Sequence, residues 1–168
     1  GAFGKCSALS EVKLPKNLTK MNAHAFFDDD ALTSILIPKK LDTTDTTYIY
    51  QFAYDYQWGP FYGCDGLREV IFEEGTTKVA RGLFANCPGL EEITLPNTIS
   101  SIEGYAFDTC VNLKEVGFSD TLTSIGFRAF SYCESLTSIN LSDSISLING
   151  GAFGKCSALS EVKLPKNL

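Results

Sequence analysis

The sequence is poor in the residues that membrane-spanning and nucleic-acid-binding proteins need. Its longest apolar runs are only a few residues, far short of the roughly 20 that a spanning helix requires. Acidic residues outnumber basic ones, 20 to 14, the formal charge is −6, and no basic cluster is present. Such a chain repels phosphate backbones. We therefore expect no membrane span in these residues and no nucleic-acid partner.

Catalytic and metal-binding patterns are also scarce. The one histidine, His24, has no nucleophile at a usable spacing, and G-x-S-x-G, H-E-x-x-H and glycine-rich phosphate loops are missing. The six cysteines form no C-x-x-C pair that could hold zinc. Two carboxylates on neighbouring strands could act as those of a glycosidase do only if a pocket shielded one of them from water. The repeat pattern predicts no such pocket. The sequence predicts a protein that is not an enzyme and holds neither cofactor nor metal.

What the sequence does have is a repeat. Phenylalanine recurs at a step of 23 residues, except that the step from Phe26 to Phe61 is 23 plus 12. The seven positions are Phe3, Phe26, Phe61, Phe84, Phe107, Phe130 and Phe153. The unit reads A-F-x-x-C-x-x-L-x-x-I-x-L-P, followed by a second apolar pair such as Leu122 and Ile125. A fixed period of this length is typical of stacked-repeat solenoids.

The unit also predicts local structure. In L-x-x-I-x-L the last two apolar positions are two residues apart, so both face inward from one strand. We expect such strands at 10–14, 34–37, 69–72, 92–95, 115–118, 138–141 and 161–164. The A-F-x-x-C segment predicts a short helical turn, and the second apolar pair another short strand. One unit cannot fold alone. Its roughly seven apolar side chains contribute about 2 kcal/mol each when buried, whereas the conformational entropy lost on ordering the unit costs about 35 kcal/mol.

The cysteines recur at the same position of the repeat, and this spacing favours free buried thiols over disulfides. Equivalent positions in stacked repeats point the same way, which suits a ladder of small buried side chains better than the turned geometry of a disulfide. Asp29 is the one departure, standing where the other units have cysteine. The triplet Asp28, Asp29 and Asp30 has no ordered calcium-ligand spacing around it, and we interpret it as a solvated turn.

The unit resembles the BspA-like leucine-rich repeats, most closely over residues 106–118, 129–141 and 152–165. The resemblance implies one right-handed β/α leucine-rich-repeat solenoid over residues 1–168, with short parallel strands, short helical turns and a 12-residue insertion near 42–55. It also implies a secreted or cell-surface protein used in adhesion to matrix or cell-surface proteins. The resemblance brings no catalytic residues.

Residues 1–18 recur letter for letter at 151–168. Ordinary repeats keep their core positions and let the surface vary, so identity that includes surface residues needs another cause. Either a tandem duplication with a 150-residue period or a deliberate arrangement of the sequence explains it, and we favour a fragment of a longer array. With no polar cap at either end, the isolated chain is expected to fray or to associate end to end.

The insertion holds the first candidate binding residues. Residues 48–62 contain five of the seven tyrosines and the only tryptophan, and such side chains dominate binding hot spots. The candidates are Tyr48, Tyr50, Tyr54 and Trp58, whereas Tyr56 and Phe61 fall at core positions. The alternatives are that these rings pack on the solenoid flank, or that they stack on sugar rings of a carbohydrate ligand.

The outward positions of the predicted strands hold the second group of candidates. Glu69, Glu92 and Glu115 form an acidic row, and such a row suits a basic partner. The repulsion between these carboxylates is weaker if Arg68 and Lys114 reach across. Leu36 and Ile71 are apolar at outward positions and strengthen the interpretation as an interface. The alternatives are that the row is merely a solvated strand face and that the whole chain is a structural spacer.

Overall fold

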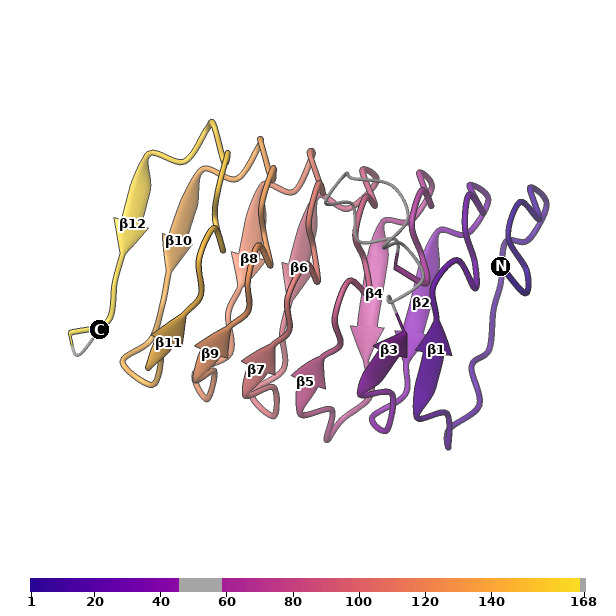
Figure 1. Ribbon diagram of the computed structural model, residues 1–168, viewed down its shortest axis with the longest axis horizontal. Coiled ribbons are helices and arrows are strands. Elements are labelled where there is room, and N and C mark those ends of the chain that lie inside the picture. The colour runs from indigo at the N-terminus through magenta and orange to yellow at the C-terminus, as the bar shows by residue number, and fades with distance from the viewer. Residues whose placement is uncertain (46–58, 167–168) are drawn as a thin grey trace.

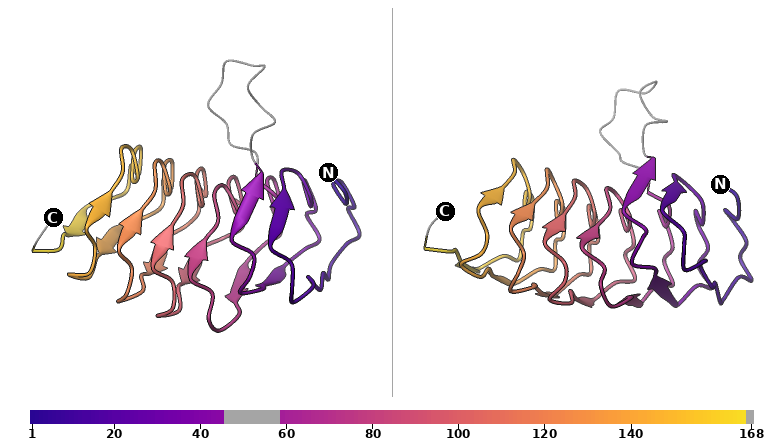
Figure 2. Two further views of the ribbon diagram at one scale, coloured as in Figure 1. Left: turned by 60° about the horizontal axis from the view of Figure 1, so that its bottom comes forward. Right: turned by 90° about the horizontal axis from the view of Figure 1, so that it is seen from below.

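The computed structural model describes residues 1–45 and 59–166. It is a parallel β-solenoid in which each 23-residue unit forms one turn, as the sequence predicted (Figure 1). The even-numbered strands lie in one row and the odd-numbered strands in a second row. The N- and C-terminal ends lie at opposite ends of the elongated molecule in all three views (Figures 1 and 2).

The two rows correspond to the two apolar segments of the repeat. The even-numbered strands are β2 (Ser34–Ile37), β4 (Glu69–Phe72), β6 (Glu92–Thr94), β8 (Glu115–Gly117), β10 (Ser138–Asn140) and β12 (Glu161–Lys163). The odd-numbered strands are β1 (Lys20–Asn22), β3 (Thr43–Asp45), β5 (Lys78–Val79), β7 (Ser101–Ile102), β9 (Ser124–Ile125) and β11 (Leu147–Ile148). All pairing is parallel and joins equivalent residues of neighbouring units. The expected second row of strands is thus confirmed.

One expected strand does not form. Residues 11–13 adopt no strand, although the identical residues 161–163 form β12. Strands this short are held by the ladder hydrogen bonds of a neighbour; β12 pairs with β10, whereas β2 pairs with β4. The prediction of a strand at 10–14 was therefore wrong.

The helical turn predicted at A-F-x-x-C is also wrong. None of the described residues is helical, and hence none belongs to a helix that could cross a membrane. The segment is a tight turn in which the second residue after the phenylalanine has a positive φ. These seven residues are Lys5, Asp28, Gly63, Asn86, Thr109, Tyr132 and Lys155. A left-handed residue at this position stops any helix after a few residues.

The core is a set of ladders running along the solenoid axis. The seven repeat phenylalanines stack nearly parallel, with ring centroids 5.1–5.6 Å apart. Each thiol from Cys64 onward donates to the carbonyl of the phenylalanine in the preceding unit, as Cys87 Sγ does to Phe61 O over 3.1 Å. All six cysteines are free, and the predicted ladder of thiols pointing one way is confirmed.

The extra residues between Phe26 and Phe61 leave the stacking unchanged. Strand β3 pairs with β1 at a spacing of 23 residues, so the repeat phase continues to Asp45. Phe61, expected in the core, is fully buried. The additional residues, expected near 42–55, therefore follow Asp45. Tyr56 lies outside the described residues.

Candidate binding face

The exposed side chains of the even-numbered strands lie on one side of the solenoid, which we call the even-strand face. Because side chains alternate along a strand, every second residue of each strand points outward. This face brings together five of the residues singled out from the sequence: Leu36, Glu69, Ile71, Glu92 and Glu115. The other four, Tyr48, Tyr50, Tyr54 and Trp58, lie outside the described residues.

An exposed apolar pair marks one part of the even-strand face. Leu36 and Ile71 are direct neighbours in the β2–β4 register, and they are 53% and 47% exposed. Covering each of these side chains would contribute about 1–2 kcal/mol to binding. Their predicted outward orientation is confirmed.

The acidic row lies beside this pair. Glu92 and Glu115 are direct neighbours in the β6–β8 register, and Glu69 stands at the equivalent position of β4. Neighbouring carboxylates at the spacing of adjacent strands repel one another by about 1 kcal/mol in water. All three are exposed, and among the described residues none of them forms an ion pair.

Two basic residues close to this row, Lys114 and Arg68, make other contacts. The Lys114 ammonium pairs with Glu91 Oε2 at 2.5 Å, and this contact lowers the pKa of Glu91. The Arg68 guanidinium donates to the carbonyl of Asp65 over 2.6 Å. Neither of these contacts involves Glu69, Glu92 or Glu115.

Two open grooves interrupt the even-strand face. Ladder pairing within this row joins β2 to β4, β6 to β8 and β10 to β12. A groove of about 530 Å³ lies at the β4–β6 junction and is lined by Arg68, Glu69, Glu91 and Glu92. A second one, of about 700 Å³, lies around the β8–β10 junction and includes Glu115 and Asn140. Their open, charged linings suit protruding side chains of a macromolecule better than an enclosed small molecule.

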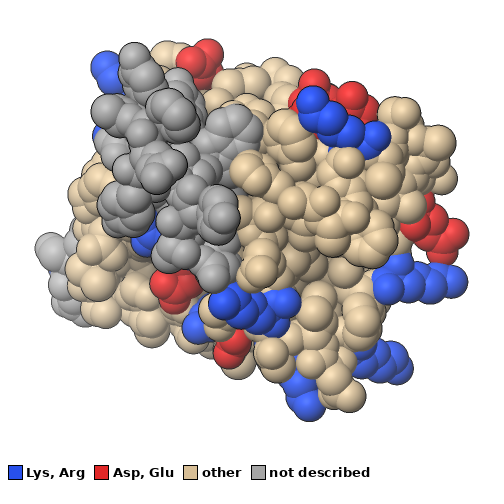
Figure 3. Space-filling view, turned by 45° about the vertical axis from the view of Figure 1, so that its right-hand side comes forward, with Lys and Arg blue, Asp and Glu red and all other residues tan. Residues whose placement is uncertain are grey.

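Outside this face, charge is mixed. Figure 3, which brings the N-terminal end forward, shows charged side chains of both signs around the rim of a mainly uncharged surface. Several of the basic side chains lie in the lower right part of this view.

The four buried thiols have the wrong chemistry for nucleophiles. Burial raises the pKa of Cys64 and of Cys110 to about 12, and it also raises the pKa of Cys87 and Cys133. Only a thiolate attacks or binds metal efficiently. The ladder is therefore part of the core and not a reactive site.

The aspartate triplet is more ordered than a solvated turn. Asp30 is exposed, as expected, but Asp29 is fully buried at the cysteine position and accepts a hydrogen bond from the Cys6 backbone N–H over 2.7 Å. Burial raises the pKa of the Asp29 carboxyl, and that hydrogen bond opposes the rise. The three carboxylates point to different partners, and the described residues contain no group of three or more potential ligands able to hold a metal ion.

Sequence reasoning missed one surface cluster. The Arg81 guanidinium lies 5.0 Å from the centre of the Tyr105 ring, Tyr105 contacts Phe127 edge to face, and Arg128 lies over Phe127 at 5.3 Å. The Thr44 hydroxyl of β3 donates to the Arg81 carbonyl, which places the cluster beside the start of the insertion. The signal was present, because the residues two and three positions before the phenylalanine are large in only some units.

Comparison with known proteins agrees with this architecture. The family model described as "BspA type Leucine rich repeat region (6 copies)" matches residues 1–57 and 57–168. A leucine-rich repeat protein from Eubacterium ventriosum superposes with a TM-score of 0.72 at 26% identity, over 95% of this chain and 39% of that one. No curated protein matches the chain.

Two further structures have the same fold. A leucine-rich repeat protein from Bacteroides ovatus gives a TM-score of 0.67 at 24% identity, over 95% of this chain and 44% of that one. A leucine-rich cell surface protein from Faecalibacterium prausnitzii gives 0.55 at 21% identity, over 96% and 55%. The chain thus spans less than half the length of the first two structures. Since the family model covers the sequence and the fold has the same repeat architecture, the chain belongs to the BspA-type leucine-rich-repeat family.

Proposed function

We propose that this chain is a non-enzymatic binding module of a secreted or cell-surface protein, and that it holds a protein partner on the even-strand face. The observation that carries the proposal is the exposed Leu36–Ile71 pair beside the unneutralised acidic row of Glu69, Glu92 and Glu115. Leucine-rich-repeat families are generally non-enzymatic, which supports the same conclusion.

The chemistry of the face defines the partner. An apolar side chain of the partner would cover Leu36 and Ile71, and lysine or arginine side chains would meet the glutamates. Burial supplies most of the affinity, whereas the charges set orientation and association rate. Matrix and cell-surface proteins with basic, partly apolar surfaces are the class we propose, in line with adhesion.

Serine substitutions test the apolar pair. Leu36→Ser with Ile71→Ser should weaken binding to immobilised matrix or cell-surface proteins by about tenfold or more, because two partly buried contacts are lost. The matched control is Leu147→Ser, since Leu147 is 50% exposed but lies on β11 in the odd row. Equal losses from both variants would contradict a site on the even-strand face.

Charge reversal tests the acidic row. Glu92→Lys with Glu115→Lys should slow association and remove most of its salt dependence. Glu134→Lys, an exposed glutamate outside the even-strand row, is the control. If binding survives these changes but is lost on replacing Tyr48, Tyr50, Tyr54 or Trp58, the site is in the insertion. Quenching of Trp58 fluorescence by a glycan would then identify a carbohydrate ligand, and binding to neither class would leave a structural spacer.

A further inference from the structure

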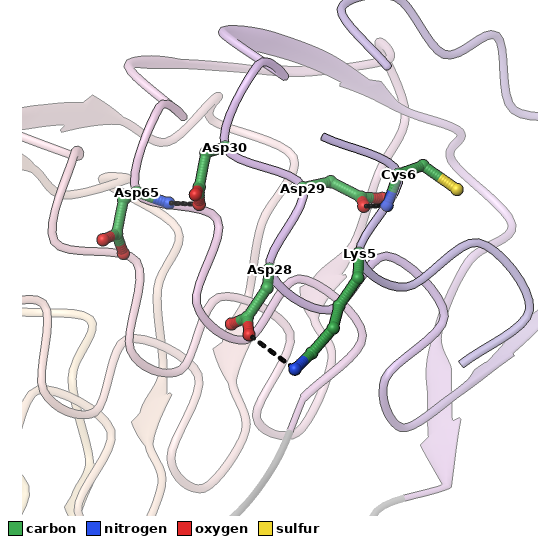
Figure 4. Close-up of polar contacts among 6 residues, drawn as sticks. All are labelled: Lys5, Cys6, Asp28, Asp29, Asp30 and Asp65. Atoms are coloured by element: carbon green, nitrogen blue, oxygen red, sulfur yellow. Dashed lines mark hydrogen bonds and ion pairs between the residues drawn. The ribbon is translucent and has the colours of Figure 1, made fainter. Parts of the chain in front are cut away.

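One buried carboxyl occupies the place that cysteine has in six units. Asp29 is the third residue after Phe26, the position of cysteine in the other units. Its side chain is fully buried. Its Oδ1 accepts the Cys6 backbone N–H over 2.7 Å, whereas its Oδ2 has no hydrogen-bond partner among the described residues (Figure 4). A buried carboxylate oxygen without a partner is costly, so the protonation state of Asp29 matters to the fold.

The cysteine ladder indicates which group this second oxygen faces. The Cys110 thiol donates to Phe84 O, 26 residues before it, and lies beside the Cys87 backbone N–H. Three other thiols have the same offset of 26 residues from their acceptors. Asp29 reproduces one half of this arrangement through the N–H that it accepts. The residue 26 positions before it is Phe3, so the repeat register sets Oδ2 against the Phe3 carbonyl oxygen.

Two facing oxygens need a proton between them. Among the described residues, no hydrogen bond reaches Phe3 O. An ionised carboxylate only accepts hydrogen bonds and would repel this carbonyl oxygen, whereas a protonated carboxyl also has an O–H to donate. With Oδ2 protonated, Asp29 donates to Phe3 O and still accepts the Cys6 N–H at Oδ1. A single proton thus gives a partner to both oxygens.

The surroundings of Asp29 favour the neutral carboxyl. Burial is the largest cause that raises its pKa, and the neighbouring carboxylates of Asp30 and Asp28 raise it further. The hydrogen bond from the Cys6 N–H opposes this rise. Both neighbours of Asp29 in the sequence thus act against its ionisation.

The adjoining units bring no cation to this carboxyl in the part of the chain that the structure describes. On one side, the Lys5 ammonium lies 4.0 Å from Asp28 Oδ2 (Figure 4). On the other side stands the Cys64 thiol, which burial keeps protonated by raising its pKa to about 12. The Asp65 carboxyl of the same unit adds negative charge when it ionises. No positive charge therefore offsets the ionisation of Asp29.

We propose that Asp29 is protonated in the folded protein and that its Oδ2–H donates to Phe3 O, which joins residues 1–18 to the unit that follows them. Asp29 then takes the role that the thiol has in other units, with one difference. A thiol in this core keeps its proton at every physiological pH, whereas a carboxyl loses its proton as pH rises. The contribution of this carboxyl to stability is present below its unfolded pKa and is lost as pH rises through its raised folded value. The link between the two units is therefore sensitive to pH.

NMR of the unaltered 168-residue chain tests the protonation directly. The carbon-13 shift of the Asp29 carboxyl, followed from acid to neutral pH, should give a titration midpoint above the ordinary value of 3.8. The Cys6 amide proton and the Phe3 carbonyl carbon should shift at the same midpoint, since both bond to this carboxyl. A midpoint at or below 3.8, or a Phe3 signal that does not respond, would overturn the proposal.

Replacement of Asp29 tests the link through stability. Asp29→Asn keeps the shape of the side chain and supplies an N–H that does not titrate, and Asp29→Cys restores the residue of the other units. In urea denaturation, both variants should lose the part of the pH dependence that Asp29 causes. At neutral pH, the folding equilibrium constant of Asp29→Asn should exceed that of the unaltered chain by about 3- to 10-fold.

Asp30→Asn is the matched control, because it makes the same charge change at the exposed neighbouring carboxyl. Its effect on the folding equilibrium constant should be smaller. Other titrating groups, Asp108 among them, are common to all these variants and cancel in the comparison. An Asp29→Asn variant that is less stable than the unaltered chain at neutral pH, or an equal gain from Asp30→Asn, would contradict the proposed link.

Discussion

The turn after each repeat phenylalanine makes the strictest demand on a single residue. Its second residue is left-handed in all seven units, yet only Gly63 is a glycine. A non-glycine residue in this conformation costs on the order of 1 kcal/mol, and a β-branched one such as Thr109 is rarer still. Because Lys, Asp, Asn, Thr and Tyr stand at this position, the sequence did not reveal the turn and suggested a helix instead.

Asp108 makes stability depend on pH. Burial raises the pKa of this carboxyl from 3.8 to about 6, and hydrogen bonds from Ser131 and Thr109 oppose the rise. A carboxyl whose folded pKa is raised contributes stability below its unfolded pKa, and this contribution is lost as pH rises through the folded value. Its charged form therefore destabilises the fold at neutral pH.

We expect Asp108→Asn to raise the free energy of unfolding at neutral pH by about 1–3 kcal/mol, because the buried charge disappears. In the unaltered protein, this group lowers the free energy of unfolding as pH rises from about 3.8 to 6. The variant should not show this decrease. Urea denaturation across this range measures both effects. Asp120→Asn, at an exposed aspartate, makes the same charge change and should leave stability nearly unaltered. An equal gain from both variants would count against the burial argument.

At the scale of elements, the alternation of apolar residues predicted the even-numbered row of strands and placed Leu36 and Ile71 outward correctly, and the second apolar pair of the repeat predicted the odd-numbered row. It could not show that residues 11–13 lack a strand, because strand formation there depends on a neighbour and not on the residues themselves. It also did not show which carboxylate Lys114 contacts. The Lys114 ammonium pairs with Glu91, which stands at the equivalent position of the preceding unit, 23 residues away. The aromatic candidates of the insertion stay a prediction.

The cysteine ladder predicts a graded reactivity. Cys6 is exposed, Cys156 is half-buried, and Cys64, Cys87, Cys110 and Cys133 are buried. Under native conditions at mildly alkaline pH, iodoacetamide should modify Cys6 first and Cys156 more slowly. The four buried thiols should react only after denaturation, because burial removes access and raises their pKa. Mass spectrometry of the modified peptides gives the order, and all six should react at similar rates in denaturant. Early modification of Cys110 would contradict the ladder.

At the scale of the whole molecule, each unit touches mainly its two neighbours, so stability is a sum of unit and interface contributions. The stack of phenylalanine rings is the element that joins all seven units. Phe107 lies in its middle, 5.6 Å from Phe84 and 5.1 Å from Phe130.

Phe107→Ala should cost about 3–5 kcal/mol and uncouple the two halves of the solenoid. Hydrogen exchange in increasing urea should then show residues 59–100 and 130–150 losing protection at different concentrations, whereas the unaltered chain loses it together. Phe127→Ala removes a ring that is 45% exposed and should cost far less. Halves that still unfold together in Phe107→Ala would show that other ladders carry the coupling.

The ring stack also explains how the fold accommodates extra sequence. Phe26 and Phe61 are 35 residues apart, yet their centroids lie 5.3 Å apart, the same as those of Phe3 and Phe26 across 23 residues. Closing a loop of 35 residues instead of 23 costs only about 0.4 kcal/mol more in chain entropy, since the cost grows with the logarithm of length. In terms of chain entropy, the fold therefore accommodates added length between Asp45 and Gly59 at little cost.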